Sequence, residues 1–229
     1  EILRCLVGSE MCIRDSLDSV TPDNFFFTEN DLAAYAVKHY NFTTHEGFNA
    51  GIWKNDNATD NQAATDYDKK WIPGQWKVPE AYDNPASNDP WYFSTIREAN
   101  YFLETVVPRF EKGEIEGSET NIKHYIGEMY FLRAKNYLSK LETFGDFPII
   151  KNTLPDESES LIQASKRAPR YKVAHFILED LDQAISLLTN NISSGKNRIT
   201  KNAALLLKSR AALFEASWLT YHKGTALVP

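Results

Sequence analysis

Cysteine is scarce in the 229-residue sequence, and both cysteines, Cys5 and Cys12, lie within the first 16 residues. Long apolar runs are also missing: no stretch approaches the roughly 18 residues of a transmembrane helix, so we predict none. The formal net charge of −6 argues against a nucleic acid as a partner. The sequence has no G-x-S-x-G, H-E-x-x-H, Walker or G-x-G-x-x-G motif, so we expect no enzyme of those classes and no cofactor.

Residues 1–16, which read EILRCLVGSEMCIRDS, resemble a translated adapter more than a native protein segment. They show no helix cap and no clean hydrophobic period that would connect them to the following sequence. We therefore expect a foreign segment at 1–16 and the native protein at 17–229. Because the native part contains no cysteine, it can hold no disulfide framework, thiolate metal site or cysteine nucleophile.

The remaining sequence is typical of a globular helical protein, with 42% apolar and 24% charged residues overall. Hydrophobic residues recur at helical spacing in five segments. Capping and turn residues predict where these helices start, namely near Thr28, Asp89-Pro90, Ser118, Pro169 and Thr200. Gly145 should end the third helix. The fifth helix is apolar almost all round through Leu219, so we expect it to be central.

The third and fifth predicted helices share a weak repeat, in which Arg133-Ala134-x-x-Tyr137 recurs as Arg210-Ala211-x-x-Phe214. A small residue one turn before an aromatic residue lets two helices approach closely. We predict an all-α fold, a tetratricopeptide-like array of helical hairpins. Residues 47–88 show no period and form a long irregular aromatic and polar insertion loop in this prediction. Residues 151–165 are predicted as a second loop.

Paired carboxylates and calcium ligands are two kinds of chemistry that the residues leave open. Acidic pairs are plentiful, so a glycosidase-type pair is possible, although no pair stands out. Asp56, Asn57 and Asp60 offer hard oxygen ligands that suit calcium. They lack EF-hand spacing, so a solvated acidic loop is the favoured interpretation and no metal is predicted.

Carbohydrate binding is the third possibility, because aromatic residues are concentrated around the same polar loop. Sugar rings present apolar C–H faces that aromatic rings can cover, while Asp, Asn and Arg bind the hydroxyl groups. Trp71 and Trp76 flank Pro73-Gly74, and Tyr82 follows them. The alternative is that these rings bury the loop against the helices, which is the favoured interpretation for Trp53 and Trp91.

An ordered series of motifs resembles the N-terminal part of the SusD/RagB family of Bacteroidetes outer-membrane lipoproteins. The series runs Phe25-Phe26-x-Thr28-x-x-Asp31-Leu32, Trp91-Tyr92-x-x-Ile96-Arg97-x-Ala99-Asn100, Gly127-Glu128-x-Tyr130-Phe131-Leu132-Arg133-Ala134-x-x-Tyr137, Phe144-Gly145-Asp146-x-Pro148, Ile177-Leu178-x-Asp180-Leu181-x-x-Ala184-Ile185 and Arg198-x-Thr200-x-x-Ala203-Ala204. It covers most of the native part.

The resemblance implies a non-enzymatic, surface-exposed protein of the outer membrane. It also implies a SusC-like TonB-dependent transporter as partner, to which a captured oligosaccharide or other nutrient is passed. In the family, ligand contacts come largely from the loop before the W-Y-x-x-I-R-x-A-N helix. Carried over, this points to the glycan-binding residues Asp56, Asn57, Asp60, Trp71 and Trp76.

The sequence departs from the family pattern at both ends. The family's signal peptide and lipid-bearing cysteine should precede residue 17, where the foreign segment lies. Residues 9–11 before Cys12 form no lipidation site, so we expect the lipid anchor to be absent from this chain. Pro229 comes before the family's C-terminal half, which should supply further ligand contacts. The alternative function is a helical-repeat scaffold that binds protein and no small ligand.

Overall fold

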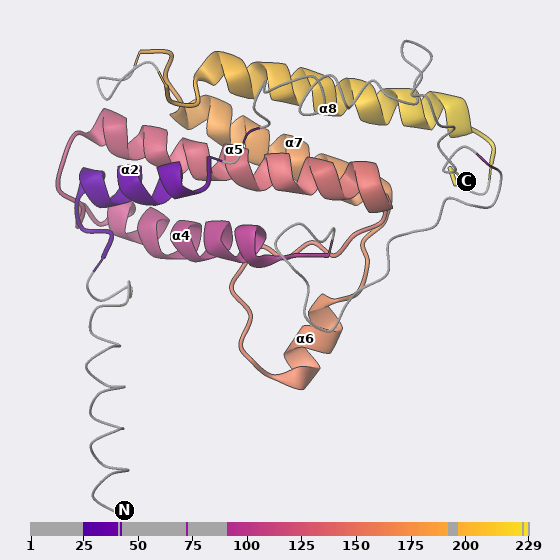
Figure 1. The fold of residues 1–229 in the computed structure, drawn as a ribbon, viewed down its shortest axis with the longest axis horizontal. Helices are drawn as coiled ribbons and strands as arrows, with labels where there is room; N and C mark the ends of the chain where they lie inside the picture. The colour runs from indigo at the N-terminus through magenta and orange to yellow at the C-terminus, as the bar shows by residue number, and fades with distance from the viewer. Residues whose placement is uncertain are drawn as a thin grey trace, which may run out of the picture.

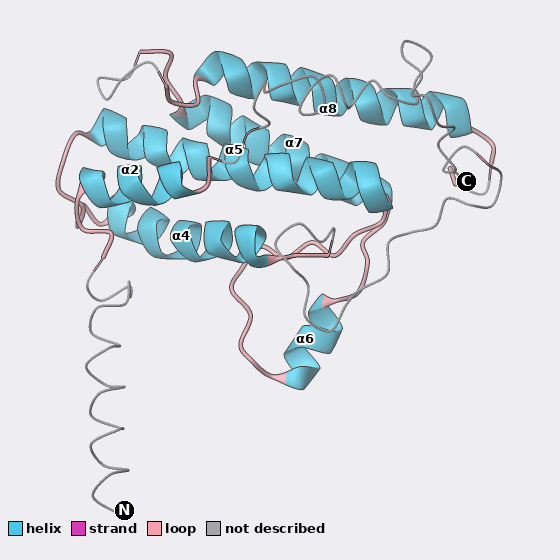
Figure 2. Ribbon diagram, in the orientation of Figure 1, coloured by secondary structure: helices cyan, strands magenta, loops and turns pink. Residues whose placement is uncertain are grey.

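The computed structural model describes residues 25–40, 42, 72, 91–191, 197–225 and 227–228, and all regular structure in these ranges is helical (Figures 1 and 2). The helices are, in chain order, α2 (Glu29–Lys38), α4 (Ser94–Glu111), α5 (Glu119–Phe144), α6 (Ser158–Ala164), α7 (Arg170–Leu187) and α8 (Lys201–His222). None of the helices in these ranges is long and apolar enough to cross a bilayer.

Helix α5 is the central element of the described part of the chain. It packs against α4 on one side and α7 on the other, while α2 lies against its first half and α8 packs mainly on α7 (Figure 1). Successive long helices are therefore neighbours in space. This arrangement is the predicted all-α array of helical hairpins.

Several helix ends lie where the sequence predicts them. The Thr28 hydroxyl accepts a hydrogen bond from the backbone N–H of Asp31, whose carboxylate accepts one from the N–H of Thr28, a complete capping box. The Thr200 hydroxyl caps α8 by a single hydrogen bond, which it accepts from the N–H of Ala203. Gly145 ends α5 with φ of 73°, a conformation that favours glycine.

Two predictions, one about a helix start and one about a loop, are wrong. Helix α4 begins at Ser94 and not at Asp89-Pro90, which lie outside the described residues. Residues 91–93 stay out of the helix because Trp91 and Phe93 pack against Phe147, and this packing outweighs the local start signal. The predicted loop 151–165 contains the short helix α6.

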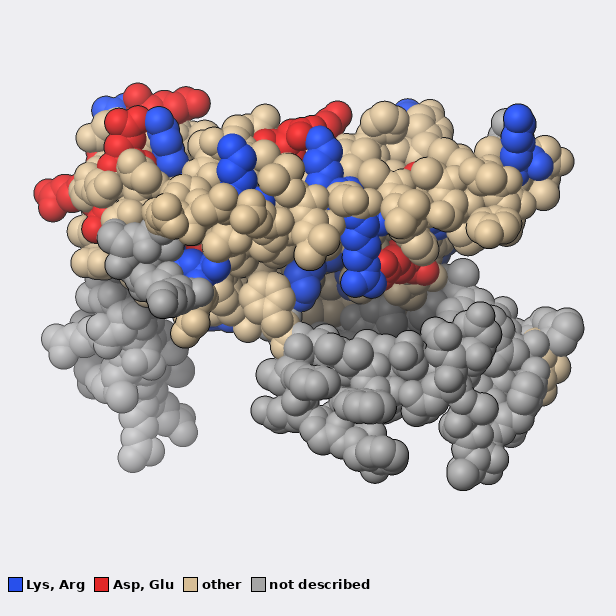
Figure 3. All heavy atoms as spheres, turned by 90° about the horizontal axis from the view of Figure 1, so that it is seen from above, with Lys and Arg blue, Asp and Glu red and all other residues tan. Residues whose placement is uncertain are grey.

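The expected central position of the fifth helix is also wrong. Helix α8 lies at the outside of the described part, and only Ala204, Ala211 and Glu215 of it are buried. Large apolar side chains on its outer side are exposed, among them Leu205, Leu206 and Leu213. Figure 3 views the molecule from this side, where uncharged residues separate scattered charged ones. Helix α8 is apolar all round because one apolar face packs on α7 and a second apolar face is exposed.

A buried polar cluster joins α2, α5 and the segment before α8. Both oxygens of the fully buried Glu128 carboxylate accept hydrogen bonds from Arg198, and one also accepts a 2.7 Å bond from the Tyr40 hydroxyl. His124 is buried beside it and accepts a bond from the N–H of Thr189. This bond ties the chain just after α7 to α5.

Candidate functional site

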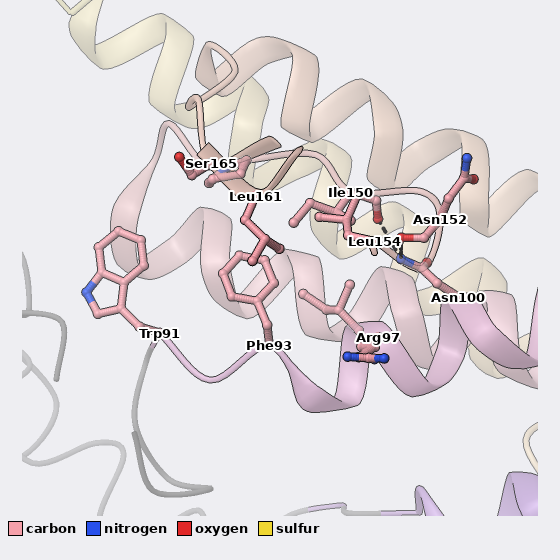
Figure 4. Close-up of a pocket in the computed structure, with 11 residues that line it drawn as sticks. Trp91, Phe93, Arg97, Asn100, Ile150, Asn152, Leu154, Leu161 and Ser165 are labelled. Atoms are coloured by element: carbon pink, nitrogen blue, oxygen red, sulfur yellow. Dashed lines mark hydrogen bonds between the residues drawn. The ribbon is translucent and has the colours of Figure 1, made fainter. Parts of the chain in front are cut away.

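A pocket of about 360 Å³ lies between the start of α4, the extended segment 148–154 and α6 (Figure 4). Its lining is mostly apolar, with a few polar side chains. The lining residues are Trp91, Phe93, Ile96, Arg97, Asn100, Pro148, Ile150, Asn152, Leu154, Leu161 and Ser165. The start of α4 thus meets residues 148–165, which lie about fifty residues later in the chain, at one concave surface.

Aromatic packing fixes one wall of the pocket. The Phe93 ring stacks on Phe147 with 5.1 Å between centroids, and the Trp91 ring contacts both Phe147 and Phe144. Phe147 is fully buried, whereas Trp91 and Phe93 are half-buried. The half-buried rings of Trp91 and Phe93 are therefore held by the buried ring of Phe147, and a ligand would meet rings that are already in place.

Hydrogen bonds from the core fix the opposite wall. The Tyr137 hydroxyl accepts a 2.9 Å bond from the N–H of Ile150 and donates to its carbonyl oxygen. Burial raises the pKa of Tyr137 to about 12, so this hydroxyl remains a donor at neutral pH. The Asn100 amide donates to the carbonyl oxygens of Ile150, at 2.9 Å, and Asn152. The backbone of 150–152 is therefore tied to α4 and α5.

A buried ion pair lies beneath these bonds. Arg133 donates two 2.7 Å bonds to the two carboxylate oxygens of Asp180 on α7 and a 2.8 Å bond to the Asn100 side-chain oxygen. Burial raises the pKa of the Asp180 carboxyl, although the bonds from Arg133 act in the opposite direction. The network links α4, α5 and α7 directly to the pocket wall.

The chemistry of the lining suits binding more than catalysis. Half-buried aromatic and aliphatic side chains are combined with the polar side chains of Arg97, Asn152 and Ser165. Mostly apolar pockets with a few polar groups are typical of small-molecule sites. No carboxylate occurs among the described lining residues, and no three potential metal ligands come together anywhere in the described ranges.

The site residues that the sequence predicts cannot be compared with this pocket. Asp56, Asn57, Asp60, Trp71, Trp76 and Tyr82 all lie outside the described residues, so their role stays a prediction. Residues 1–16 and the loop 47–88, apart from Ile72, also lie outside them.

Sequence reasoning missed the pocket itself. The expected packing of Trp91 is confirmed, but the same ring also lines the pocket. Phe93, Arg97 and Asn152 were not singled out as a site. One signal was available: Asn100 is a polar residue on the buried apolar face of α4, and such residues are usually held by specific hydrogen bonds.

Comparisons with known proteins place these observations in a family context. A SusD-like family model, described as "Starch-binding associating with outer membrane", matches residues 15–213. No curated protein matches the chain.

Solved structures also match. A SusD-like protein from Bacteroides fragilis is 28% identical, with 60% of this chain and 26% of that chain covered and a TM-score of 0.46. A laminarin binding SusD-like protein is 22% identical, with 56% and 26% covered and a TM-score of 0.46. Surface glycan-binding protein A from Bacteroides uniformis is 17% identical, with 55% and 26% covered and a TM-score of 0.43. The chain thus spans about a quarter of the length of these proteins.

Proposed function

Because the chain belongs to the SusD-like family, whose description is starch-binding and associating with the outer membrane, we propose that it binds an oligosaccharide in the pocket at the start of α4. The observation that carries the proposal is the combination of Trp91 and Phe93 with the polar side chains of Asn152 and Ser165 in one pocket. The rings can cover the C–H face of a sugar, and the polar groups can bind its hydroxyls.

The expected mode of action is capture without turnover. Aromatic contacts contribute about 0.5–1.5 kcal/mol each beyond the burial of area, so two rings support a modest affinity. Hydrolysis by the usual glycosidase mechanisms needs a pair of carboxyl groups, and the described lining offers none. The proposed function is therefore that of a binding protein and not an enzyme.

The finer expectations form part of the same proposal. After capture, the oligosaccharide would pass to a SusC-like TonB-dependent transporter at the cell surface, where a lipid anchor would hold the protein. Support comes from the family description, which includes association with the outer membrane. Trp71, Trp76, Tyr82 and the acidic loop residues would add contacts from residues 47–88.

Calorimetric titration of the protein against a panel of oligosaccharides tests the proposal. Trp91→Ala should weaken binding strongly, and Asn152→Ala should weaken it without loss of packing because the Asn152 side chain is exposed. Tyr171→Ala is the matched control, since Tyr171 is 52% exposed on α7 and does not line the pocket. Thermal unfolding of each variant separates lost binding from lost folding.

Two outcomes would contradict the proposed site. Unchanged affinity in both folded pocket variants would move the site elsewhere, and a loss of binding in a Trp71→Ala, Trp76→Ala double variant would then place it on the loop. A protein that binds no member of the panel would favour the second candidate function, protein binding without a small ligand. The exposed apolar face of α8, with Leu205, Leu206 and Leu213, is the observation that favours that candidate.

A further inference from the structure

Arg97 differs from the other arginines that the helices hold in place. Three buried or half-buried arginines pair with carboxylates, in Arg133–Asp180, Arg170–Glu215 and Arg198–Glu128, and the half-buried Arg109 donates to the carbonyl oxygen of Phe25. Arg97 lines the pocket and is exposed, and its guanidinium group has no hydrogen-bond or ion-pair partner among the described residues. The adjacent Glu98 carboxylate faces Lys38 and His39 instead.

Arg97 is also the one charged side chain of the described lining. The other polar lining residues, Asn100, Asn152 and Ser165, are neutral. The Asn100 amide is already engaged with backbone carbonyls. Figure 4 shows Arg97 on α4 between Phe93 and Asn100, with Ile150 and Leu154 on the facing segment. The pocket therefore combines apolar walls with an uncompensated positive charge.

A second cation contacts a lining residue of this pocket without lining the pocket itself. The guanidinium group of Arg167 lies 5.1 Å from the centre of the Trp91 ring, and no carboxylate in the described part of the chain pairs with it. Glu157 and Glu159 on the α6 side accept hydrogen bonds from Ser160 and Gln163, and neither lines the pocket. Glu104 accepts hydrogen bonds from Thr153 and does not line the pocket either. The described lining itself is thus positively charged, through Arg97, although the whole chain carries −6.

We propose that this pocket selects an acidic oligosaccharide, with the guanidinium group of Arg97 binding a carboxylate or sulfate group of the sugar. The inference rests on the proposed function, because it names the class of glycan for the same site. Arginine binds both groups through paired, charge-assisted N–H···O bonds. The negative net charge gives no general attraction for anions, so recognition must come from local groups such as Arg97.

Two matched pairs of probes test the proposal by calorimetry. One pair is a galacturonic acid oligosaccharide and its methyl ester, and the other is a sulfated galactan oligosaccharide and its unsulfated form. We expect the charged member of at least one pair to bind about tenfold or more tightly than its neutral partner, as for a hydrogen bond to a charged group. The pair that shows the preference identifies the anionic group. Added salt should reduce this preference.

Arg97→Gln should lower the affinity for the charged probe about tenfold, so that the charged and neutral probes bind almost equally. Arg97→Lys should restore part of the preference, because it returns the charge without the paired geometry. Arg210→Gln is the matched control, since Arg210 is 73% exposed on α8 and lies outside the pocket. It should leave the preference intact.

The inference and the proposed function fail differently. Equal affinity of the native protein for the charged and neutral probes overturns the inference alone, as does a preference that Arg97→Gln leaves intact. Binding confined to neutral members of the wider panel also overturns it. Absence of binding to every charged and neutral oligosaccharide overturns the proposed function as well.

Discussion

The Arg133–Asp180 pair gives the sharpest test of how the pocket wall is held. Both side chains are almost fully buried, with 7% and 5% of their surfaces exposed. Asp180→Asn keeps the shape of the side chain and removes its charge, which leaves the Arg133 guanidinium group buried without a counter-ion. Breaking a buried pair in this way costs about 3–5 kcal/mol of unfolding free energy.

The loss should be visible in thermal unfolding. For a chain of this size each kcal/mol shifts Tm by about 2–4 °C, so Asp180→Asn should lower Tm by roughly 6–20 °C. Asp182→Asn on the same helix is the matched control, because the Asp182 side chain is 59% exposed and its pair with Lys208 lies at the surface. That change should cost at most about 1 kcal/mol.

A double variant separates the pair from its surroundings. Arg133→Met together with Asp180→Leu removes both charges, so its cost should be smaller than the sum of the two single costs. It should not be zero, since Asn100 loses the bond that Arg133 donates to its side-chain oxygen. Equal, small Tm shifts for Asp180→Asn and Asp182→Asn would refute the reasoning. Strict additivity of the two single free-energy costs in the double variant would refute it as well.

Three further predictions concern the surrounding fold. Burial lowers the pKa of His39 more than the Glu98 carboxylate raises it, so the unfolded chain binds this proton at a higher pH than the folded protein does. The free energy of unfolding, measured with denaturant, should therefore decrease as the pH falls below 6.5, the ordinary pKa of histidine. The decrease should be smaller in His39→Gln. In the same assay, Gly117→Ala should lower the free energy of unfolding by more than Gly113→Ala does. Both glycines have a positive φ, but only at Gly117 would the new Cβ meet another residue, Glu29, at 2.7 Å. Leu206→Gln should change unfolding free energy by no more than about 0.5 kcal/mol, since Leu206 is 73% exposed; a large loss would show that α8 packs on both faces.

Features set by neighbouring residues were predictable from the sequence. The start of α2 follows from Thr28 and Asp31, which satisfy each other's backbone groups within four residues. The end of α5 follows from Gly145, whose positive φ suits glycine. Such signals are local, so no knowledge of the rest of the fold is needed. The ordered motifs indicated the family, and the match of the family model to residues 15–213 confirms that resemblance.

Features set by distant contacts were not predictable in the same way. The start of α4 lies at Ser94 because Phe93 stacks on Phe147, which follows the end of α5, a contact that no local pattern encodes. For α8, the sequence shows that both faces are apolar, but it does not show which face packs on another helix. Hydrophobicity predicts burial only when something covers the surface, and in the described part only α7 and the edge of α5 do so.

The pocket shows why a binding site is harder to predict than a helix. Its walls come from α4, segment 148–154 and α6. The position of segment 148–154 is set by Asn100, Arg133 and Tyr137, none of which is a proposed ligand contact. Asn100 donates to the backbone carbonyls of Ile150 and Asn152, so the position of α4 determines where segment 150–152 lies. Asn100→Leu fits the apolar face but removes both bonds, so a folded Asn100→Leu protein should bind oligosaccharide more weakly in calorimetric titration. Unchanged affinity in a folded Asn100→Leu protein would mean that the wall is held without this network.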